Sequence, residues 1–182
     1  MRAPRSVRFV PLAVLATFAA GAACAAEMNV AVELPKLDVA EYHRPYVAMW
    51  IEREDASFVA NLSVWYQEKR GGGGAGGGEG GTKWLNELRT WWRKNGREQT
   101  FPIEGVTGPT KPAGIQQVKF AGDKAPLASL APGKYRLVVE AAREGGGREV
   151  VRVPFEWPAK SAQSLTSKGS SELGTVALNV SP

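Results

Sequence analysis

Short segments with the residue pattern of β-strands, separated by turn signals, recur along most of this chain and constrain its fold more than any other feature. Residues 28–34 alternate polar and apolar side chains with the period of two that is typical of a half-buried strand. Further strand candidates cover residues 46–53, 57–67, 114–120, 134–142, 148–157 and 175–180. Seven short strands at regular spacing predict a mainly β fold, an antiparallel sandwich of immunoglobulin-like type.

One helix is predicted within this β pattern. Residues 71–81 contain nine Gly, one Ala and one Glu, which is typical of a solvated loop insertion. The order Gly81-Thr82-Lys83 at its end lacks the Gly-Lys-Ser/Thr of a phosphate-binding loop. Thr82 is a candidate N-cap and Asn95-Gly96 a stop signal, so we expect one inserted α-helix over about 82–95. Its apolar stripe should lie against the sheet and comprises Trp84, Leu85, Leu88, Trp91 and Trp92.

The N-terminus has the three parts of a secretory signal peptide. Three Arg and no acid among the first eight residues precede an apolar run over 9–20 and a small-residue stretch over 21–26. The apolar run is shorter than the ~20 residues that a membrane-spanning helix needs. We therefore expect residues 1–26 to be removed and no direct membrane span to remain. Lipid modification of Cys24 is the alternative interpretation.

Removal of this segment changes the charge and the cysteine content. The full chain has a formal charge of +5, and loss of three Arg from its 23 basic residues leaves 20 against 18 acids, a charge of +2. The mature chain therefore gives no indication of nucleic-acid binding. Cys24 is the only cysteine, so none remains for a disulfide or an iron–sulfur cluster. We expect one periplasmic domain over 27–158, followed by a polar tail and a final strand over 159–182.

Side chains suited to catalysis are scarce. His43 is the only histidine and no Gly-x-Ser-x-Gly motif is present, so neither a metal centre nor a Ser-His-Asp hydrolase is predicted. We expect His43 to be a surface or loop residue and the protein not to be an enzyme.

The adjacent Trp91 and Trp92 project about 100° apart on a helix, so at least one should be partly exposed. With Arg93 and Lys94 they form a candidate contact surface.

The loop that ends near Thr110 carries the sharpest motif of the chain. Residues 98–113 contain three Pro and two Gly and predict an irregular, exposed connection. Within it, residues 104–110 (EGVTGPT) resemble the recognition motif of the bacterial FAD:protein FMN transferase, Asp-x-x-Ser/Thr-Gly-Ala-Ser/Thr. The matching residues are Thr107, Gly108 and Thr110, whereas Glu104 replaces the aspartate and Pro109 the alanine. The resemblance implies that the Thr110 hydroxyl receives FMN through a phosphoester bond.

Longer segments resemble a family of periplasmic proteins known as domain of unknown function 2271. These segments are residues 32–36 (VELPK), 46–52 (YVAMWIE), 84–85 (WL), 91–94 (WWRK), 105–110 (GVTGPT) and 135–143 (YRLVVEAAR). The resemblance implies a domain encoded near PepSY-type membrane proteins and the FMN transferase, and proposed to carry covalent FMN in electron transfer outside the cytoplasm. By this resemblance Thr110 is the attachment site, Thr107 and Gly108 are the recognition core, and Glu104 is a substituted acid.

A separate short segment resembles another known domain. Residues 131–137 (APGKYRL) are similar to the start of a strand in the Ig-like domain of flagellar hook-capping proteins. This resemblance bears on the fold and implies no shared function.

Two functions of different classes follow. The first is a periplasmic electron carrier with FMN on Thr110, in which the domain positions the flavin and nearby aromatic and charged groups tune its potential. The alternative is a cofactor-free Ig-like binding or adaptor module, in which edge strands and the Trp91–Trp92 pair contact another envelope protein. In that case Pro109 and Pro112 simply fix the path of a connecting loop. The first function requires that a modifying enzyme can reach the Thr110 hydroxyl.

Overall fold

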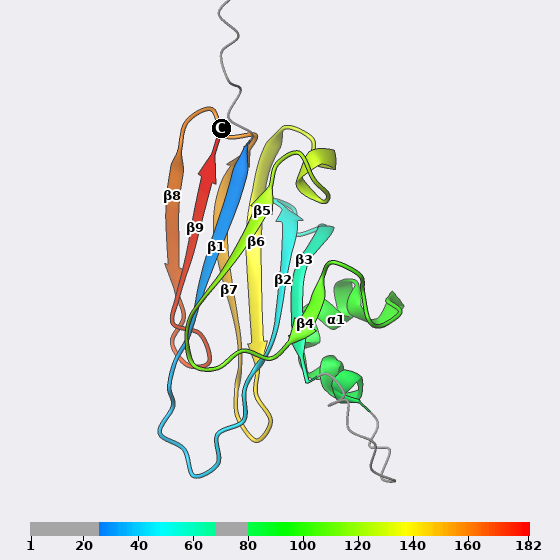
Figure 1. Cartoon of the computed structure of the whole chain (residues 1–182), viewed down its shortest axis with the longest axis vertical. Coiled ribbons are helices and arrows are strands. Elements are labelled where there is room, and N and C mark those ends of the chain that lie inside the picture. Colours follow the sequence, from blue (N-terminus) through cyan, green and yellow to red (C-terminus); the bar gives the residue numbers. More distant parts are fainter. Residues whose placement is uncertain (1–25, 68–79) are drawn as a thin grey trace, which may run out of the picture.

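The computed structural model describes residues 26–67 and 80–182, and within these residues nine strands form two sheets that pack face to face (Figure 1). The first sheet, in the order β5-β1-β9-β8, contains β1 (Glu27–Leu34), β5 (Gly114–Ala121), β8 (Gln163–Lys168) and β9 (Thr175–Ser181). The second sheet, in the order β4-β3-β2-β6-β7, contains β2 (Tyr46–Arg53), β3 (Phe58–Tyr66), β4 (Thr107–Pro109), β6 (Gly133–Ala142) and β7 (Arg148–Trp157). Only the β3–β4 pair is parallel among these strands, so the prediction of a mainly β, largely antiparallel fold is confirmed.

Two predicted segments fall mostly outside this description. The predicted signal peptide lies outside the described residues except for Ala26, which precedes β1. The Gly-rich loop 71–81 also lies outside them except for its last two residues. Gly81 is buried, so the solvated loop does not include this residue.

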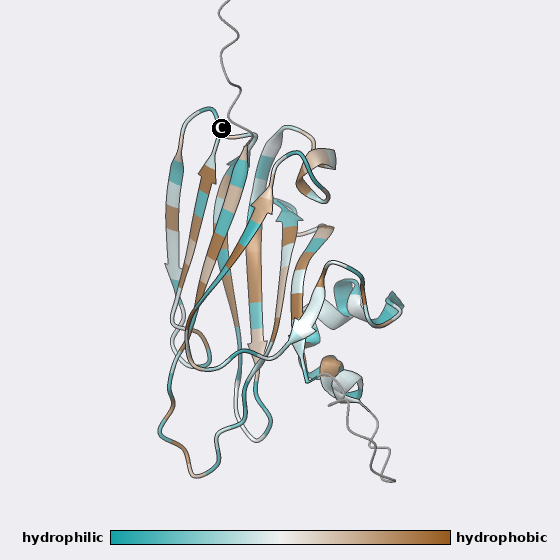
Figure 2. Ribbon diagram, in the orientation of Figure 1, coloured by the Kyte–Doolittle hydropathy of each residue, from teal (hydrophilic) through white to brown (hydrophobic). Residues whose placement is uncertain are grey.

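All seven predicted strands are present, and the alternation of their side chains places the main core between the two sheets. Along β1, Met28, Val30, Val32 and Leu34 are buried, and the residues between them are partly exposed. Bands of hydrophobic and hydrophilic residues alternate in the same way along the strands of the first sheet (Figure 2). Inward residues of β1 and β9 meet those of β2, β6 and β7 in one apolar cluster. Each fully buried large apolar side chain contributes roughly 1.5–3 kcal/mol relative to its exposed state.

A helical insertion covers the outer face of the second sheet, beside β3 and β4 (Figure 1). It contains the 3-10 helix η1 (Gly81–Glu87), the α-helix α1 (Arg89–Lys94) and the 3-10 helix η2 (Gly96–Glu98). Leu85, Leu88 and Trp91 are fully buried in a second apolar cluster with outward-facing residues of β2, β3 and β6. The prediction that the stripe lies against the sheet is confirmed for these three residues, whereas Trp84 stays 45% exposed.

The prediction of one continuous α-helix over 82–95 is wrong. The chain turns at Leu88 (φ −75°, ψ 65°), where η1 ends and α1 begins. Thr82 is not an N-cap, because it lies within η1 and its hydroxyl donates to the Gly80 carbonyl oxygen at 3.2 Å. The predicted stop is confirmed, since α1 ends at Lys94 and Asn95 is its C-cap.

A buried carboxylate of the sheet explains where α1 starts. Glu140 on β6 is fully buried, and its two oxygens accept the backbone N–H groups of Thr90 (3.0 Å) and Trp91 (2.8 Å). A negative group at these otherwise unpaired N–H groups stabilises a helix N-terminus. The contact comes from a residue about 50 positions away, so local propensity does not reveal it.

Two short strands, β4 and β8, were not predicted. β4 has three residues, one of them Gly and one Pro, and β8 lies within the segment 159–172 that we expected to be a polar tail. Along β8 only Leu165 packs against the core, so the apolar alternation that marks the other strands is nearly absent. Together β8 and β9 complete the first sheet, and β9 pairs with β1, so residues 159–182 belong to the same two-sheet unit.

The remaining helix of the described residues is η3 (Leu127–Ser129), between β5 and β6. In the part of the chain that the structure covers, no helix has the length and apolar character needed to cross a membrane.

Candidate functional site

The Thr110 motif lies along the open edge of the second sheet. β4 pairs in parallel with β3 at this edge, and the Val64 N–H donates to the Val106 carbonyl oxygen at 2.9 Å. One residue beyond β4, the Thr110 N–H donates to the Tyr66 carbonyl oxygen at 3.2 Å. The backbone of the motif is therefore held in a defined register, with Thr110 at the point where the edge strand ends.

Pro109 fits this edge without loss of a ladder bond. Val106 and Thr110 both bond to β3 through their backbone groups, so by alternation along the strand the backbone of Pro109 points away from β3. A Pro at such a position on an edge strand removes no inter-strand hydrogen bond. The adjacent Gly108 is open, because a Cβ built on it meets no atom within 4 Å. Replacement of the motif's alanine by Pro is therefore compatible with the local fold.

The two hydroxyls of the motif have different environments. The Thr107 Oγ1 donates to the Ile103 carbonyl oxygen at 2.9 Å, so it is engaged within the loop. Thr110 is partly exposed, and its Oγ1 has no hydrogen-bond partner among residues 26–67 and 80–182. Glu104 is exposed in the turn that precedes β4, where Gly105 adopts a φ of +70°. Thr110 is thus the hydroxyl of this motif that is free to react.

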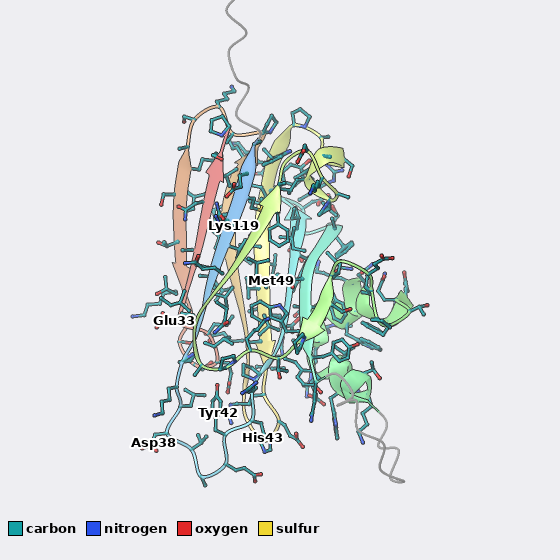
Figure 3. All side chains as sticks on the ribbon, viewed as in Figure 1. Glu33, Asp38, Tyr42, His43, Met49 and Lys119 are labelled. Carbon is teal, nitrogen blue, oxygen red and sulfur yellow. The ribbon has the colours of Figure 1, made fainter. Side chains whose placement is uncertain are left out.

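Thr110 opens into a cavity of about 760 Å³ at one end of the sandwich. Its walls come from the segment before β2, the hairpin between β6 and β7, the end of β3, and η1. Figure 1 shows the first two of these at the same end of the molecule, and Figure 3 shows Tyr42 and His43 there. The lining residues are Tyr42, His43, Arg44, Tyr46, Gln67, Trp84, Glu87, Pro109, Thr110 and residues 142–146. The volume lies within the ~300–1,000 Å³ of typical small-molecule sites.

One cationic side chain in the cavity wall is fixed by a buried acid. The guanidinium of Arg143 pairs with both carboxylate oxygens of Glu172, at 3.0 and 3.1 Å, and both side chains are almost fully buried. The Gly147 N–H also donates to Glu172, at 2.7 Å. A bidentate pair of this kind restrains geometry as well as charge. It ties the β6–β7 hairpin, which forms one wall, to the loop before β9.

The other charged groups of the wall differ in whether they have partners. His43 lies 3.3 Å from Glu41 and 3.8 Å from Glu144, and Glu87 lies 3.6 Å from Arg89. Arg44 is exposed and has neither an ion pair nor a hydrogen bond to any residue that the structure describes. Arg44 is therefore the charged side chain of the cavity wall that has no partner among the described residues.

Three aromatic residues contribute to the same wall. Trp84 projects from η1, and the Lys83 Nζ lies 5.1 Å from the centroid of its ring. Tyr46 is half-buried, and burial raises the pKa of its hydroxyl above the ordinary value of 10, against a hydrogen bond with the Gln67 backbone that lowers it. Tyr42 completes the set. Half-exposed aromatic faces around a cavity suit a planar ring system.

The candidate contact surface of Trp91, Trp92, Arg93 and Lys94 is changed by the structure. Trp91 is fully buried, and its indole N–H donates to Asn61, so its assignment to an exposed surface is wrong. Trp92 is partly exposed, which confirms that one of the adjacent pair is accessible. Lys94 pairs with the buried Glu52 at 3.1 Å. None of the four lines the cavity at Thr110.

His43 is a half-exposed loop residue, as predicted. Among residues 26–67 and 80–182 no group of three or more His, Cys, Asp or Glu is placed to hold a metal ion.

The cavity residues Tyr42, Arg44 and Trp84 were not predicted as site residues. They lie in segments far from the motif, and only Trp84 was named, as part of the buried stripe.

Comparison with known proteins identifies a family and no individual relative. A search of curated proteins and a search of solved structures both gave no match. A family model described as "predicted periplasmic protein" matches residues 27–175, which include β1 to β8 and the Thr110 motif. The chain therefore belongs to the family of predicted periplasmic proteins known as domain of unknown function 2271.

Proposed function

We propose that the mature protein is a periplasmic flavin carrier, with FMN attached to the Thr110 hydroxyl by the FAD:protein FMN transferase. It exchanges electrons with a PepSY-type membrane protein and performs no turnover chemistry of its own. In this proposal the signal peptide directs export, and the two sheets are an immunoglobulin-like sandwich related in form to that of the hook-capping proteins. The flavin supplies the redox chemistry, and the domain holds it and sets its surroundings.

The observation that carries this proposal is the position of the Thr110 oxygen. A group that another enzyme modifies has to leave its own fold and enter a second active site, which favours an exposed edge. Thr110 is partly exposed at the end of an edge strand, and its Oγ1 has no partner among the described residues. Had this oxygen been packed between the sheets, attachment would require unfolding of the domain.

The residues present also fit the attached group. Transfer from FAD joins the Thr110 oxygen to the phosphorus of the FMN half, breaks the pyrophosphate bond, and releases AMP and the hydroxyl proton. The product needs space beside the oxygen, and the cavity of about 760 Å³ provides it. The open backbone at Gly108 leaves the recognition core accessible. Glu104, exposed in the preceding turn, supplies the acid of the motif.

The test is export of the chain together with the transferase, followed by intact-mass measurement and visible absorbance. The wild type should gain the mass of one FMN less one water and turn yellow. Thr110→Ala should stay unmodified. Thr100→Ala removes another exposed Thr of the same connection and is the matched control, which should remain fully modified. An unmodified, colourless wild type would overturn the proposal.

A second candidate, a cofactor-free adaptor, is favoured by the edge of the first sheet. β5 is an edge strand of eight residues, and Ile115 on it is 67% exposed. Such an edge can add a strand from a partner protein. If the unmodified protein is such an adaptor, Ile115→Lys should abolish its association with the partner in cells where it carries no flavin. Equal association of the wild type and Ile115→Lys with the partner would contradict the adaptor function.

A further inference from the structure

The wall of the Thr110 cavity combines two features that differ from the rest of the described surface. Trp84 is one of only three large apolar side chains exposed in the described residues, and it is the only one of them in the cavity wall. Arg44 in the same wall has no counter-ion there. An exposed aromatic face next to an unpaired cation suits a ligand that is both planar and anionic.

The two acids of this wall, Glu87 and Glu144, have other neighbours, and neither is paired with Arg44. Glu87 is 3.6 Å from Arg89, and Glu144 is 3.8 Å from His43, which offsets a carboxylate charge only when its ring is protonated. Arg143 is neutralised by Glu172. These arrangements leave Arg44 as the cation that is available to an entering anion.

The orientation of Trp84 is also supported from within η1. The Lys83 ammonium lies 5.1 Å from the indole centroid, a cation–π contact that restrains the ring. The start of η1 is fixed in turn, because the Gly81 N–H donates to the Gln67 carbonyl oxygen at 3.1 Å and Gly81 packs against Tyr46. The indole is therefore presented on a defined segment at the rim, although no apolar core surrounds it.

We propose that this cavity is the binding site for the ring system of the flavin, with Trp84 as its stacking surface and Arg44 as the cation that faces its anionic parts. This inference rests on the proposed attachment at Thr110 and adds the place of the ring. The ring lies inside the cavity against η1 and does not extend into solvent. Trp84 and Arg44 are positioning residues, since they bind and orient the group and take no part in its attachment.

The test uses the full exported chain in both modified and unmodified forms. In the modified protein, flavin fluorescence is divided by the FMN content from intact mass and absorbance, and is compared before and after proteolysis. Stacking on an indole quenches flavin emission, so the wild type should brighten on proteolysis. Trp84→Ala should already be bright. Trp92→Ala, which removes the other partly exposed Trp of the insertion outside the cavity, is the matched control and should remain quenched.

The unmodified protein gives an independent measurement with free FMN as the probe. Wild type and Thr110→Ala should bind free FMN equally, because the ring site does not need the covalent bond. Trp84→Ala should bind about tenfold more weakly, as expected for one lost stacking contact. Arg44→Gln should weaken binding of FMN more than binding of riboflavin, which lacks the phosphate, and Arg44→Lys should restore it in part.

The outcomes separate the two proposals. Emission that is the same in wild type and Trp84→Ala, with FMN attached, overturns the ring site and leaves the attachment intact. Absence of added mass overturns the attachment, and the free-FMN titration then decides the ring site alone. Weaker binding of free FMN by Trp84→Ala than by the wild type supports the ring site. Equal binding by the two proteins, or no binding by the wild type, overturns it.

Discussion

Arg143 and Glu172 form a buried bidentate ion pair that joins the β6–β7 hairpin to the loop before β9, with N–O distances of 3.0 and 3.1 Å. Arg143 lines the cavity at Thr110, so this pair fixes one of its walls. The partners are 29 residues apart in sequence, and Glu172 also accepts the Gly147 N–H at 2.7 Å. This wall of the cavity is therefore held by the Glu172 carboxylate, which accepts two N–H groups of Arg143 and the N–H of Gly147.

Glu172→Gln should destabilise the protein by about 3–5 kcal/mol, because it leaves the Arg143 charge buried without a counter-ion. Urea unfolding measures this loss. Glu98→Gln breaks the exposed pair with Arg97 and should cost less than about 1 kcal/mol. Equal losses for the two variants would contradict the structural role of Glu172.

Glu140→Gln should loosen the start of α1 specifically. The charged carboxylate accepts the N–H groups of Thr90 and Trp91 and an Nη1–H of Arg148, and a neutral amide cannot satisfy all three. The expected loss is about 1–3 kcal/mol. Hydrogen exchange at the Thr90 and Trp91 amides should accelerate, while exchange in the first sheet changes only with global stability. Glu156→Gln, at an exposed position of β7, should leave these two amides unchanged.

Glu149 should make the protein sensitive to acid. Burial alone would raise the pKa of this carboxyl, but hydrogen bonds from the backbone of Leu173, Ser170 and Ser171 lower it from 4.5 to about 2. A pKa that is lower in the folded state contributes stability above pH 4.5, and this contribution is lost as the pH falls towards 2.

Glu149→Gln tests this pH dependence. At pH 7 the variant should be less stable than wild type by about 1–2 kcal/mol, a value reduced for solvent screening at this partly exposed position. The difference should shrink as the pH is lowered through the same interval. A gap in unfolding free energy that stays constant from pH 7 to pH 2 would show that the carboxylate charge is not responsible.

Gly81→Ala should distort the cavity as well as destabilise the fold. A Cβ at this position would clash with the Tyr46 hydroxyl and with the Gln67 backbone carbonyl, which has no freedom to move as a side chain would. The cost should be about 1–3 kcal/mol. Gly108→Ala is the contrasting substitution, because its Cβ meets nothing within 4 Å. It should change stability by less than about 0.5 kcal/mol. Thermal unfolding of the two variants measures the contrast.

The strands could be predicted because alternation along a strand depends on burial of one face. Val30 and Val32 mark β1 for this reason, whereas β8 has only Leu165 directed at the core and lacks the pattern. The break at Leu88 could not be predicted, since it depends on Glu140, which meets α1 only after β6 has joined the sheet. Residue propensity in 82–95 favours a helix throughout, and the tertiary contact decides where it starts.

The site was predictable only in part. The motif points to Thr110 and its loop composition indicates exposure, but nothing in the sequence shows that the Thr107 hydroxyl is engaged with Ile103 while that of Thr110 is free. The cavity also draws Arg44 and Trp84 from separate segments, which come together only through the fold. Trp84 fits a helical apolar stripe by spacing. It is exposed because η1 is a 3-10 helix, in which Leu85 and Leu88, three residues apart, share the buried face and Trp84 lies off it.

Intact mass of the chain exported together with the FAD:protein FMN transferase tests the central claim most directly. Wild type and Thr100→Ala should each carry one FMN less one water, and peptide mapping should place it on Thr110. Thr110→Ala should carry none. Wild-type protein without added mass, or a Thr110→Ala variant that keeps it, would contradict the account.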